Sequence, residues 1–203
     1  MYVKRRKAEQ SESTRAALLI AAHELFAEQG YADTATEEIV QRARVTRGAL
    51  YHHFRDKQDL FRAVYEDVER EVVREVNAVA SECQGDAWDR VRAGCHAFVG
   101  ACLEPEIQRI ALVDAPSVLG WETWRKIDRK GLGLFRQGIE LAMEAGFIER
   151  QPVQPLAHLL LGALVEAVIL VARARDVENA RREVGGTIDR LLDGLRTPSS
   201  TSA

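Results

Sequence analysis

Apolar residues recur at steps of three and four along most of the chain, which is the spacing of one face of an α-helix. In the range 11–30 the apolar stripe consists of Leu18, Ala22, Leu25 and Phe26. Gly30 follows as a helix stop, because glycine tolerates the left-handed conformation that ends many helices. No segment shows the two-residue alternation of a half-buried strand, and the first proline is Pro105. The pattern predicts an all-α fold.

Two short helices that meet at a tight turn are predicted next. Thr34 and Glu37 have the spacing of a capping box, in which the threonine hydroxyl binds an orphan backbone N–H and the glutamate binds back to the cap. Thr46 is expected to cap the second helix, residues 47–54. That helix is too short to be stable alone, so Ala49, Leu50 and Phe54 must anchor it inward. This leaves an exposed set, which is Arg47, Gly48, Tyr51 and His52.

The stretches GYADTATEEIV and RVTRGALYHHFRDKQDLF resemble the helix-turn-helix domain of TetR-family transcriptional regulators. That family's pattern ends in Tyr-x-His-Phe-x-x-Lys, which is Tyr51, His53, Phe54 and Lys57 here. The resemblance covers residues 11–63 and implies a three-helix DNA-binding domain, with the helix-turn-helix at about 35–54. Arg44 departs from it, because the family often has a glycine at this turn, and a non-glycine residue in a left-handed turn costs roughly 1 kcal/mol.

The exposed set and the family's contact positions together predict the DNA-binding residues. These are Thr36, Thr46, Arg47, Gly48, Tyr51, His52, His53 and Lys57. Arg47 is expected to read a base, and Tyr51, Thr36 and Lys57 are expected to hold phosphates. His53 has two interpretations, which are support for Tyr51 and contact with a phosphate.

The remainder of the chain, residues 64–196, is predicted to be a helical body. Asp56 can cap a long fourth helix that ends near Glu82 and connects the two domains. Gly85–Asp86 starts another helix, Pro105 opens the next, and Pro116 is expected to end it. The last three helices are expected at about 122–146, 154–175 and 177–195. Residues 197–203 have nothing to bury and are expected to be disordered.

The segment PLAHLLLGALVEAVILVA is apolar nearly all round, and such a helix must be covered on nearly all sides. A two-fold homodimer in which the last two helices of each chain form a four-helix bundle would cover it, and the TetR resemblance implies the same. The alternative is a central helix buried within one chain. A charge engineered at Leu191 or Val168 is expected to split the dimer or unfold it.

Charge divides unevenly along the chain. Residues 1–62 hold 11 Lys plus Arg against 9 Asp plus Glu, whereas the rest holds 17 against 22. A weakly basic head on an acidic body is typical of a protein that offers one end to phosphate. The cluster Lys4–Lys7 lies in a flexible arm, residues 1–10, which either reaches DNA or is a solvated terminus.

A small-molecule effector is expected in the body, where aromatic and polar groups lie near a proline break or on predicted inward faces. The candidates are His96, Phe98, Trp121, Trp124, Phe135, Met143 and Glu166. Ordinary core packing is the alternative for each. Glu166 lies in the middle of an apolar helix, so it needs a partner, either an arginine across the dimer or a group in the pocket.

Other chemistry is not indicated by the sequence. We find no nucleophile elbow, phosphate loop or paired metal-ligand histidines, so no enzyme, cofactor or metal site is expected. Cys83, Cys95 and Cys102 match neither zinc ligation nor a disulfide framework and are expected to be buried thiols, with a thiol switch of Cys95 and Cys102 as the alternative. Neither a secretory signal nor a membrane span is expected, which predicts a cytoplasmic protein.

The sequence therefore predicts a dimeric transcriptional regulator that binds double-stranded operator DNA. The family resemblance implies a repressor that is released by a small apolar or amphipathic molecule. The rival interpretation is a helical small-molecule-binding protein or enzyme of the same fold that has lost operator binding through Arg44.

Overall fold

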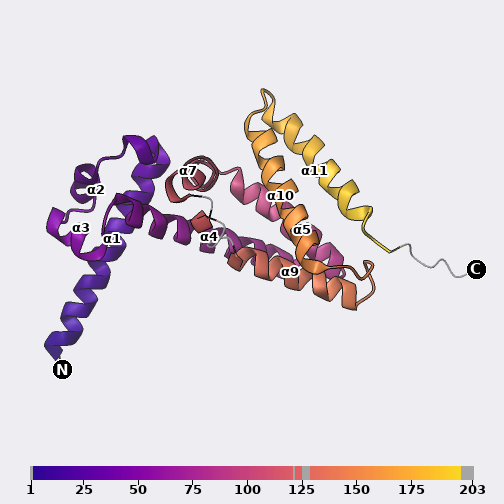
Figure 1. Ribbon diagram of the computed structural model, residues 1–203, viewed down its shortest axis with the longest axis horizontal. Coiled ribbons are helices and arrows are strands. Elements are labelled where there is room, and N and C mark those ends of the chain that lie inside the picture. Colours follow the sequence, from indigo (N-terminus) through magenta and orange to yellow (C-terminus); the bar gives the residue numbers. More distant parts are fainter. Residues whose placement is uncertain (1, 121, 125–128, 198–203) are drawn as a thin grey trace, which may run out of the picture. The chain divides into compact units, whose positions relative to one another are not determined.

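The computed structural model consists almost entirely of helices (Figure 1). It describes residues 2–120, 122–124 and 129–197, with side chains from residue 9 onward except at 129 and 130. Within these residues the only extended pairing is an isolated antiparallel bridge between Ile148 and Arg196. The predicted all-α fold is confirmed.

The chain folds into two compact units. The first contains residues 1–70 and 105–127, and the second contains residues 71–104 and 128–203. Residues 105–127 thus return to the first unit, although a division in sequence order would assign them to the second. Helix α4, Lys57–Glu82, contributes residues to both units.

Among its described residues, the first unit includes the helices α1 Tyr2–Asp33, α2 Thr36–Arg42, α3 Arg47–His53, the beginning of α4, α6 Pro105–Ile107, η1 Gln108–Asp114 and α7 Ala115–Leu119. We call α1–α3 and the first turns of α4 the head. The core of the first unit includes Leu18, Phe26, Ile39, Leu50, Phe61 and Ile110, each of which is completely buried. The apolar stripe predicted on the first helix lies in this core.

The first helix begins at Tyr2, earlier than the expected Ser11, so the backbone of most of the expected flexible arm is helical. At its other end Gly30 has φ 85° and ψ 168°, which interrupts the helix as predicted. This combination of angles is essentially restricted to glycine. The side chains of Lys4–Lys7 lie outside the described residues.

The prediction that Pro116 ends a helix is wrong. Residues 105–119 are continuously helical, and the chain leaves the helix at Gly120, where φ is 75°. The reason is η1, a π-helical segment in which the backbone N–H of Ala115 donates to the carbonyl of Ile110, five residues earlier. In an α-helix a proline ring clashes with the carbonyl four residues before it. The wider π-turn accommodates that ring.

Side chains of η1 bind the end of α1. The guanidinium of Arg109 donates to the carbonyl of Gln29 at 3.1 Å and lies 3.6 Å from the carboxylate of Asp114. Asp114 in turn accepts a hydrogen bond of 2.9 Å from the backbone N–H of Tyr31. These contacts satisfy backbone groups that the kink at Gly30 removes from the helical ladder. They attach residues 105–119 to the head.

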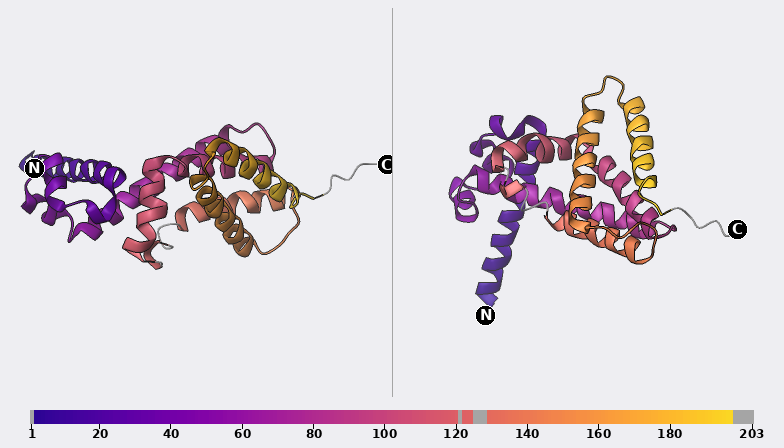
Figure 2. Two further views of the ribbon diagram at one scale, coloured as in Figure 1. Left: turned by 90° about the horizontal axis from the view of Figure 1, so that it is seen from above. Right: turned by 45° about the vertical axis from the view of Figure 1, so that its right-hand side comes forward.

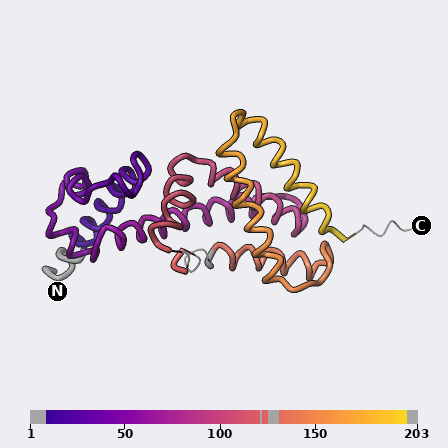
Figure 3. Tube along the Cα trace, turned by 45° about the horizontal axis from the view of Figure 1, so that its top comes forward, coloured from indigo at the N-terminus to yellow at the C-terminus, as the bar shows by residue number. Residues whose placement is uncertain are grey.

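The second unit contains the end of α4 together with α5 Ala87–Cys102, α9 Arg129–Glu144, α10 Val153–Ala172 and α11 Val177–Asp193. Asp86 caps α5 as predicted, because its carboxylate accepts from the backbone N–H groups of Trp88 and Asp89. Trp88 is fully buried, and its indole N–H donates to the carbonyl of Leu192 at 3.0 Å. Helices α10 and α11 run antiparallel, side by side (Figures 2 and 3).

Helix α10 has a buried face and an exposed apolar face. Among the described residues it is the one helix long and apolar enough to cross a membrane, with a mean hydropathy of 2.1, a test that core helices also pass. Val168 and Val171 are completely buried within the unit. Leu159 and Leu170 are 74% and 57% exposed. Val168 therefore packs inside its own chain, so of the two outcomes expected for a charge at this residue, its burial favours unfolding over dissociation of a dimer.

Candidate nucleic-acid interface

The turn between α2 and α3 is left-handed at Arg44, whose φ is 54°. The backbone N–H of Arg44 donates to Gln41, and that of Val45 donates to Val40 at 3.0 Å. Val45 is partly buried against the core and lies in the corner between the two helices. The turn that usually takes a glycine therefore forms with arginine.

The predicted capping box at Thr34 and Glu37 is wrong. Helix α2 begins at Thr36, and Thr34 is buried, with its hydroxyl donating to the carbonyl of Gly30 at 2.7 Å. Glu38, rather than Glu37, accepts from the backbone N–H of Ala35 at 3.2 Å. The kink at Gly30 leaves carbonyls at the end of α1 without a helical partner, and the Thr34 hydroxyl satisfies one of them.

Helix α3 is capped and anchored as predicted. The Thr46 side chain accepts a hydrogen bond of 3.2 Å from the backbone N–H of Ala49. Leu50 and Phe54 are buried in the core of the head. The opposite face is exposed and consists of Arg47, Gly48, Tyr51 and His52. We call this set the α3 face.

Arg47 lies close to two other side chains, Glu37 and Tyr51. Its guanidinium lies 2.9 Å from the carboxylate of Glu37 and 5.6 Å from the centre of the Tyr51 ring. The Thr36 hydroxyl donates to the same carboxylate at 3.1 Å. The pKa of Glu37 is lowered by a hydrogen bond from its own backbone N–H, then by Thr36 and by Arg47, so the carboxylate is charged near neutral pH. Thr36 and Arg47 thus meet at Glu37, which sequence reasoning did not select as a site residue.

Lys57 has partners inside the head. Its ammonium group donates to the carbonyls of Tyr31 at 2.8 Å and Thr34 at 2.9 Å, and it lies 4.2 Å from the centre of the Tyr31 ring. Burial, and then the charge of Asp56, raise the pKa of Tyr31, so its ring remains neutral. The structure thus gives Lys57 an internal role, which the family signature does not reveal.

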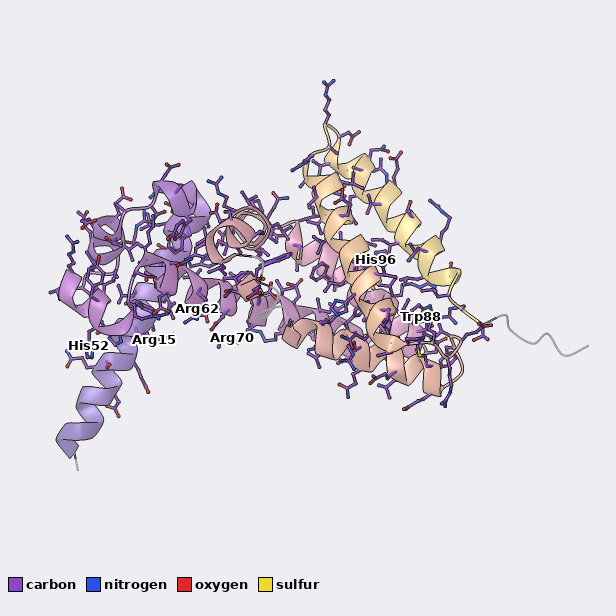
Figure 4. The ribbon with its side chains drawn as sticks, viewed as in Figure 1. Arg15, His52, Arg62, Arg70, Trp88 and His96 are labelled. Atoms are coloured by element: carbon purple, nitrogen blue, oxygen red, sulfur yellow. The ribbon has the colours of Figure 1, made fainter. Side chains whose placement is uncertain are left out.

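Aromatic side chains at the end of α3 lie close to Arg15 of α1. The rings of His52 and His53 are 5.2 Å apart, and the Arg15 guanidinium of α1 lies 5.4 Å from the Phe54 ring. Arg15 and His52 lie on the same side of the head (Figure 4). The pKa of His53 is lowered by burial first, and then by the charges of His52 and Arg15. Sequence reasoning missed Arg15, which precedes the helix-turn-helix by about twenty residues.

The candidate effector residues that the structure describes are divided between the two units. His96 hydrogen bonds to Asp189 of α11 at 2.8 Å, and Phe98 and Phe135 are half-buried on α5 and α9 of the second unit. Trp124 packs, half-buried, against the core of the first unit. Trp121 lies outside the described residues.

Glu166 is exposed on α10, so the expectation that it faces inward is wrong. Residues 159, 162, 163, 166 and 170 share the exposed side of α10, as their three- and four-residue spacing requires. A carboxylate there is solvated in the single chain. The alternative of an arginine across a dimer is still open.

Cys83 and Cys95 are free cysteines among the described residues. Cys95 and Cys102 are buried, as expected, whereas Cys83 is half-buried. Burial raises the pKa of Cys95 to about 12, so its thiol is protonated and unreactive near neutral pH. Met143 is buried too, in α9.

Comparison with known proteins extends this picture over the whole chain. Residues 18–64 match the family described as bacterial regulatory proteins of the tetR family, and residues 88–195 match the tetracyclin repressor-like C-terminal domain. A solved TetR-family transcriptional regulator from Pectobacterium atrosepticum is 36% identical with a TM-score of 0.82, and the alignment covers 93% of this chain and 97% of that one. The chain belongs to the TetR family of transcriptional regulators.

Curated TetR-type relatives match over part of their length. The regulator AcrR of Shigella flexneri is 44% identical over 62 residues, which is 30% of this chain and 29% of AcrR. The repressor BepR of Brucella suis is 47% identical over 62 residues, again 29% of its length. The TetC protein of transposon Tn10 from Escherichia coli is 26% identical over 127 residues, 64% of its length. The chain thus spans less than two thirds of the length of each of these three relatives.

TetR-family regulators bind operator DNA and usually act as dimers. The head of this chain has the helix-turn-helix that such binding needs, with α3 capped by Thr46 and its outer face open to solvent.

Proposed function

We propose that this protein is a dimeric, cytoplasmic repressor that leaves its operator when a small apolar or amphipathic molecule binds. The observation that carries the proposal is the α3 face, with Arg47 held between Glu37 and Tyr51 on a helix whose other side is buried. An arginine on the exposed face of such a helix can recognise guanine by a bidentate contact in the major groove. Tyr51, Thr36 and His52 would then lie near the backbone or neighbouring bases.

The left-handed turn at Arg44 supports DNA binding over the rival interpretation. Loss of operator binding was suggested by this residue alone, because arginine is unfavourable in that turn. The turn nevertheless forms, with φ 54°, and Val45 still packs in the corner. The feature that motivated a helical binding protein without operator affinity therefore does not distort α3.

A dimer would use the exposed side of α10 with α11. Leu159 is 74% exposed and Leu191 is 47% exposed, although both are large apolar residues on antiparallel neighbouring helices. Packing these faces in a four-helix bundle removes them from water and places two heads on one operator, with half-sites about one helical turn of DNA apart. In such a bundle Glu166 would need a partner from the other chain.

The effector is proposed to bind in the body, where Phe98 and Phe135 lie on α5 and α9, which pack against each other. Aromatic linings with a few polar groups are typical of small-molecule sites. Helix α4 contributes to both units and would transmit the change to the head.

A mobility-shift assay with the DNA upstream of the protein's own gene tests operator binding. Replacing Arg47 by Ala is expected to cost about 1–3 kcal/mol of binding free energy and to relax sequence preference, because a base-specific contact is lost. Equal losses on specific and random DNA would exclude base reading by Arg47. No retardation of the upstream DNA by the unmodified protein would favour the rival function.

The thermodynamic linkage between effector binding and operator binding tests whether an effector releases the operator. An effector that releases the operator must itself bind more weakly in the presence of operator, by the same factor. Apolar compounds that quench tryptophan fluorescence should therefore be titrated with and without operator DNA. Equal affinities in the two titrations would leave a ligand site but exclude this induction mechanism.

A further inference from the structure

Arg15 is placed at the end of α3 by an aromatic contact. Its guanidinium lies 5.4 Å from the centre of the Phe54 ring, and Phe54 is only 3% exposed. A guanidinium that stacks on an aromatic face keeps its N–H donors directed outward at the edges. The exposed Arg15 side chain therefore offers donors to solvent at a fixed place beside α3.

Most arginines of the first unit are paired with carboxylates. Those within 4.0 Å of one are Arg42, Arg47, Arg55, Arg62, Arg70 and Arg109. Among the described residues of the unit, Arg15 and Arg44 have no such ion pair. Arg15 thus combines a held position with an uncompensated charge, which is the state that favours an external anion.

His53 lies close enough to Arg15 for the charge of the guanidinium to affect its pKa. His53 is half-buried, and its ring lies 6.4 Å from the Phe54 ring and 5.2 Å from the His52 ring. The charged groups that act on it are His52 of its own helix and Arg15 of α1. Burial is the largest cause of its lowered pKa, followed by His52 and Arg15. All three causes disfavour the imidazolium in the free protein. A phosphate at this place would oppose both of the charge effects.

We propose that Arg15 and His53 together form a binding site for one operator phosphate, and that the operator is bound with uptake of a proton at His53. This rests on the proposed DNA-binding function and adds a residue of α1 to the interface. It also makes operator affinity depend on pH through one identified side chain.

The sign of the dependence follows from the two protonation states. In the free protein His53 is neutral at neutral pH. In the complex with DNA, the neighbouring phosphate stabilises the protonated, cationic imidazole of His53. Affinity therefore rises as pH falls through the higher, bound-state pKa, and levels off below the lower, free-state pKa, where both forms carry the proton. One proton corresponds to a change of at most about tenfold in affinity per pH unit.

The experiment measures binding of the full chain to its upstream DNA by fluorescence anisotropy, between about pH 6 and pH 8 and at several salt concentrations, the range in which histidine titrates. The variants are His53→Gln, His52→Gln, Arg15→Gln and Arg15→Lys. His23→Gln is the matched control, because His23 also lies on α1 but about 12 Å further along the helix axis than Arg15.

We expect the unmodified protein and His23→Gln to bind more tightly at lower pH, and His53→Gln to lose most of that dependence. Arg15→Gln should lower the salt slope by about 1, the effect of one phosphate contact, and Arg15→Lys should restore it. In the free protein, NMR titration should show the pKa of His53 rising in Arg15→Gln, because a nearby positive charge is removed. That last readout needs no DNA, so it also reports on a variant with weakened binding.

Three results would overturn the site. The first is that His53→Gln binds the operator with the same pH dependence as the unmodified protein. The second is that only His52→Gln loses the pH dependence, and the third is that Arg15→Gln has an unchanged salt slope. These differ from failure of the proposed function itself, in which the unmodified protein would bind no upstream DNA at any pH.

Discussion

At the residue scale, Lys57 shows how a signature residue can serve the fold. Its ammonium donates to the carbonyls of Tyr31 and Thr34. In Lys57→Met these acceptors lose their donor, so we expect the free energy of unfolding to fall by about 1 kcal/mol. Urea unfolding followed by circular dichroism measures the change.

Arg55→Met is the control for Lys57, because the Arg55 side chain is 79% exposed in its ion pair with Asp59. Its expected effect is within about 0.5 kcal/mol. If Lys57→Met unfolds like the unmodified protein but shows a smaller salt slope in DNA binding, then Lys57 acts as a phosphate contact and its internal bonds are unimportant.

Arg44 stores a small strain in the helix-turn-helix. With φ at 54°, arginine is in the left-handed region, where glycine has no steric penalty. Arg44→Gly is expected to raise the free energy of unfolding by up to about 1 kcal/mol, less the greater entropy of glycine in the unfolded chain. Arg44→Val is expected to lower it by about 1 kcal/mol or more, because β-branched residues are poorly tolerated there. Equal stability of the two variants would show that the turn is not left-handed in solution.

At the element scale, the end of α1 and the segment η1 depend on each other. An added Cβ at Gly30 would lie 2.0 Å from Nη2 of Arg109, whereas at Gly120 it would meet nothing within 4 Å. The two glycines have similar backbone angles, φ 85° and ψ 168° against φ 75° and ψ 154°. Alanine at either position therefore carries a similar backbone cost, and only Gly30→Ala displaces Arg109.

We therefore expect Gly30→Ala to destabilise the protein more than Gly120→Ala, by about 1 kcal/mol, the net worth of the hydrogen bond that Arg109 must give up. In an Arg109→Ala background, Gly30→Ala should cost about as much as Gly120→Ala does in the unmodified protein, because no Arg109 side chain is left to displace. Thermal unfolding of the unmodified protein, the three single variants and the Gly30→Ala/Arg109→Ala double variant gives the comparison. Equal losses for the two glycine substitutions would mean that Arg109 moves aside without cost.

At the scale of the whole molecule, the exposed apolar side of α10 and α11 is expected to hold two chains together. Leu159→Glu places a charge at a side chain that is 74% exposed in one chain but would be buried in the dimer. A buried unpaired charge costs several kcal/mol, so this variant should be monomeric at micromolar concentration and still helical. Light scattering and circular dichroism measure the two properties.

Leu141→Glu is the control for the dimer, because Leu141 is 52% exposed on α9, away from α10 and α11 in the sequence. It should leave the oligomeric state unchanged. A monomeric unmodified protein, or dissociation by both substitutions alike, would contradict an interface on α10 and α11. Val168 is unsuitable for this test, because a charge there would disrupt the core of its own unit.

The sequence by itself determined the features that depend on local physics. Helical periodicity indicated the fold class. The residue types themselves indicated the stop at Gly30, the Thr46 cap and the start of α5 at Asp86. The outward set on α3 followed in the same way, because a short helix must bury its apolar side. Each of these depends on residues within about one or two helical turns.

Only the tertiary structure decided the features that join distant residues or depend on backbone carbonyls left unpaired elsewhere. Thr34 and Lys57 both turned to the end of α1, because the kink at Gly30 left carbonyls there without partners. Pro116 did not end its helix, because a π-turn before it made room for the ring. The packing of α1 against α3 places Arg15 beside Phe54, and the packing of α10 leaves Glu166 exposed. The spacing of side chains along one helix does not specify either arrangement.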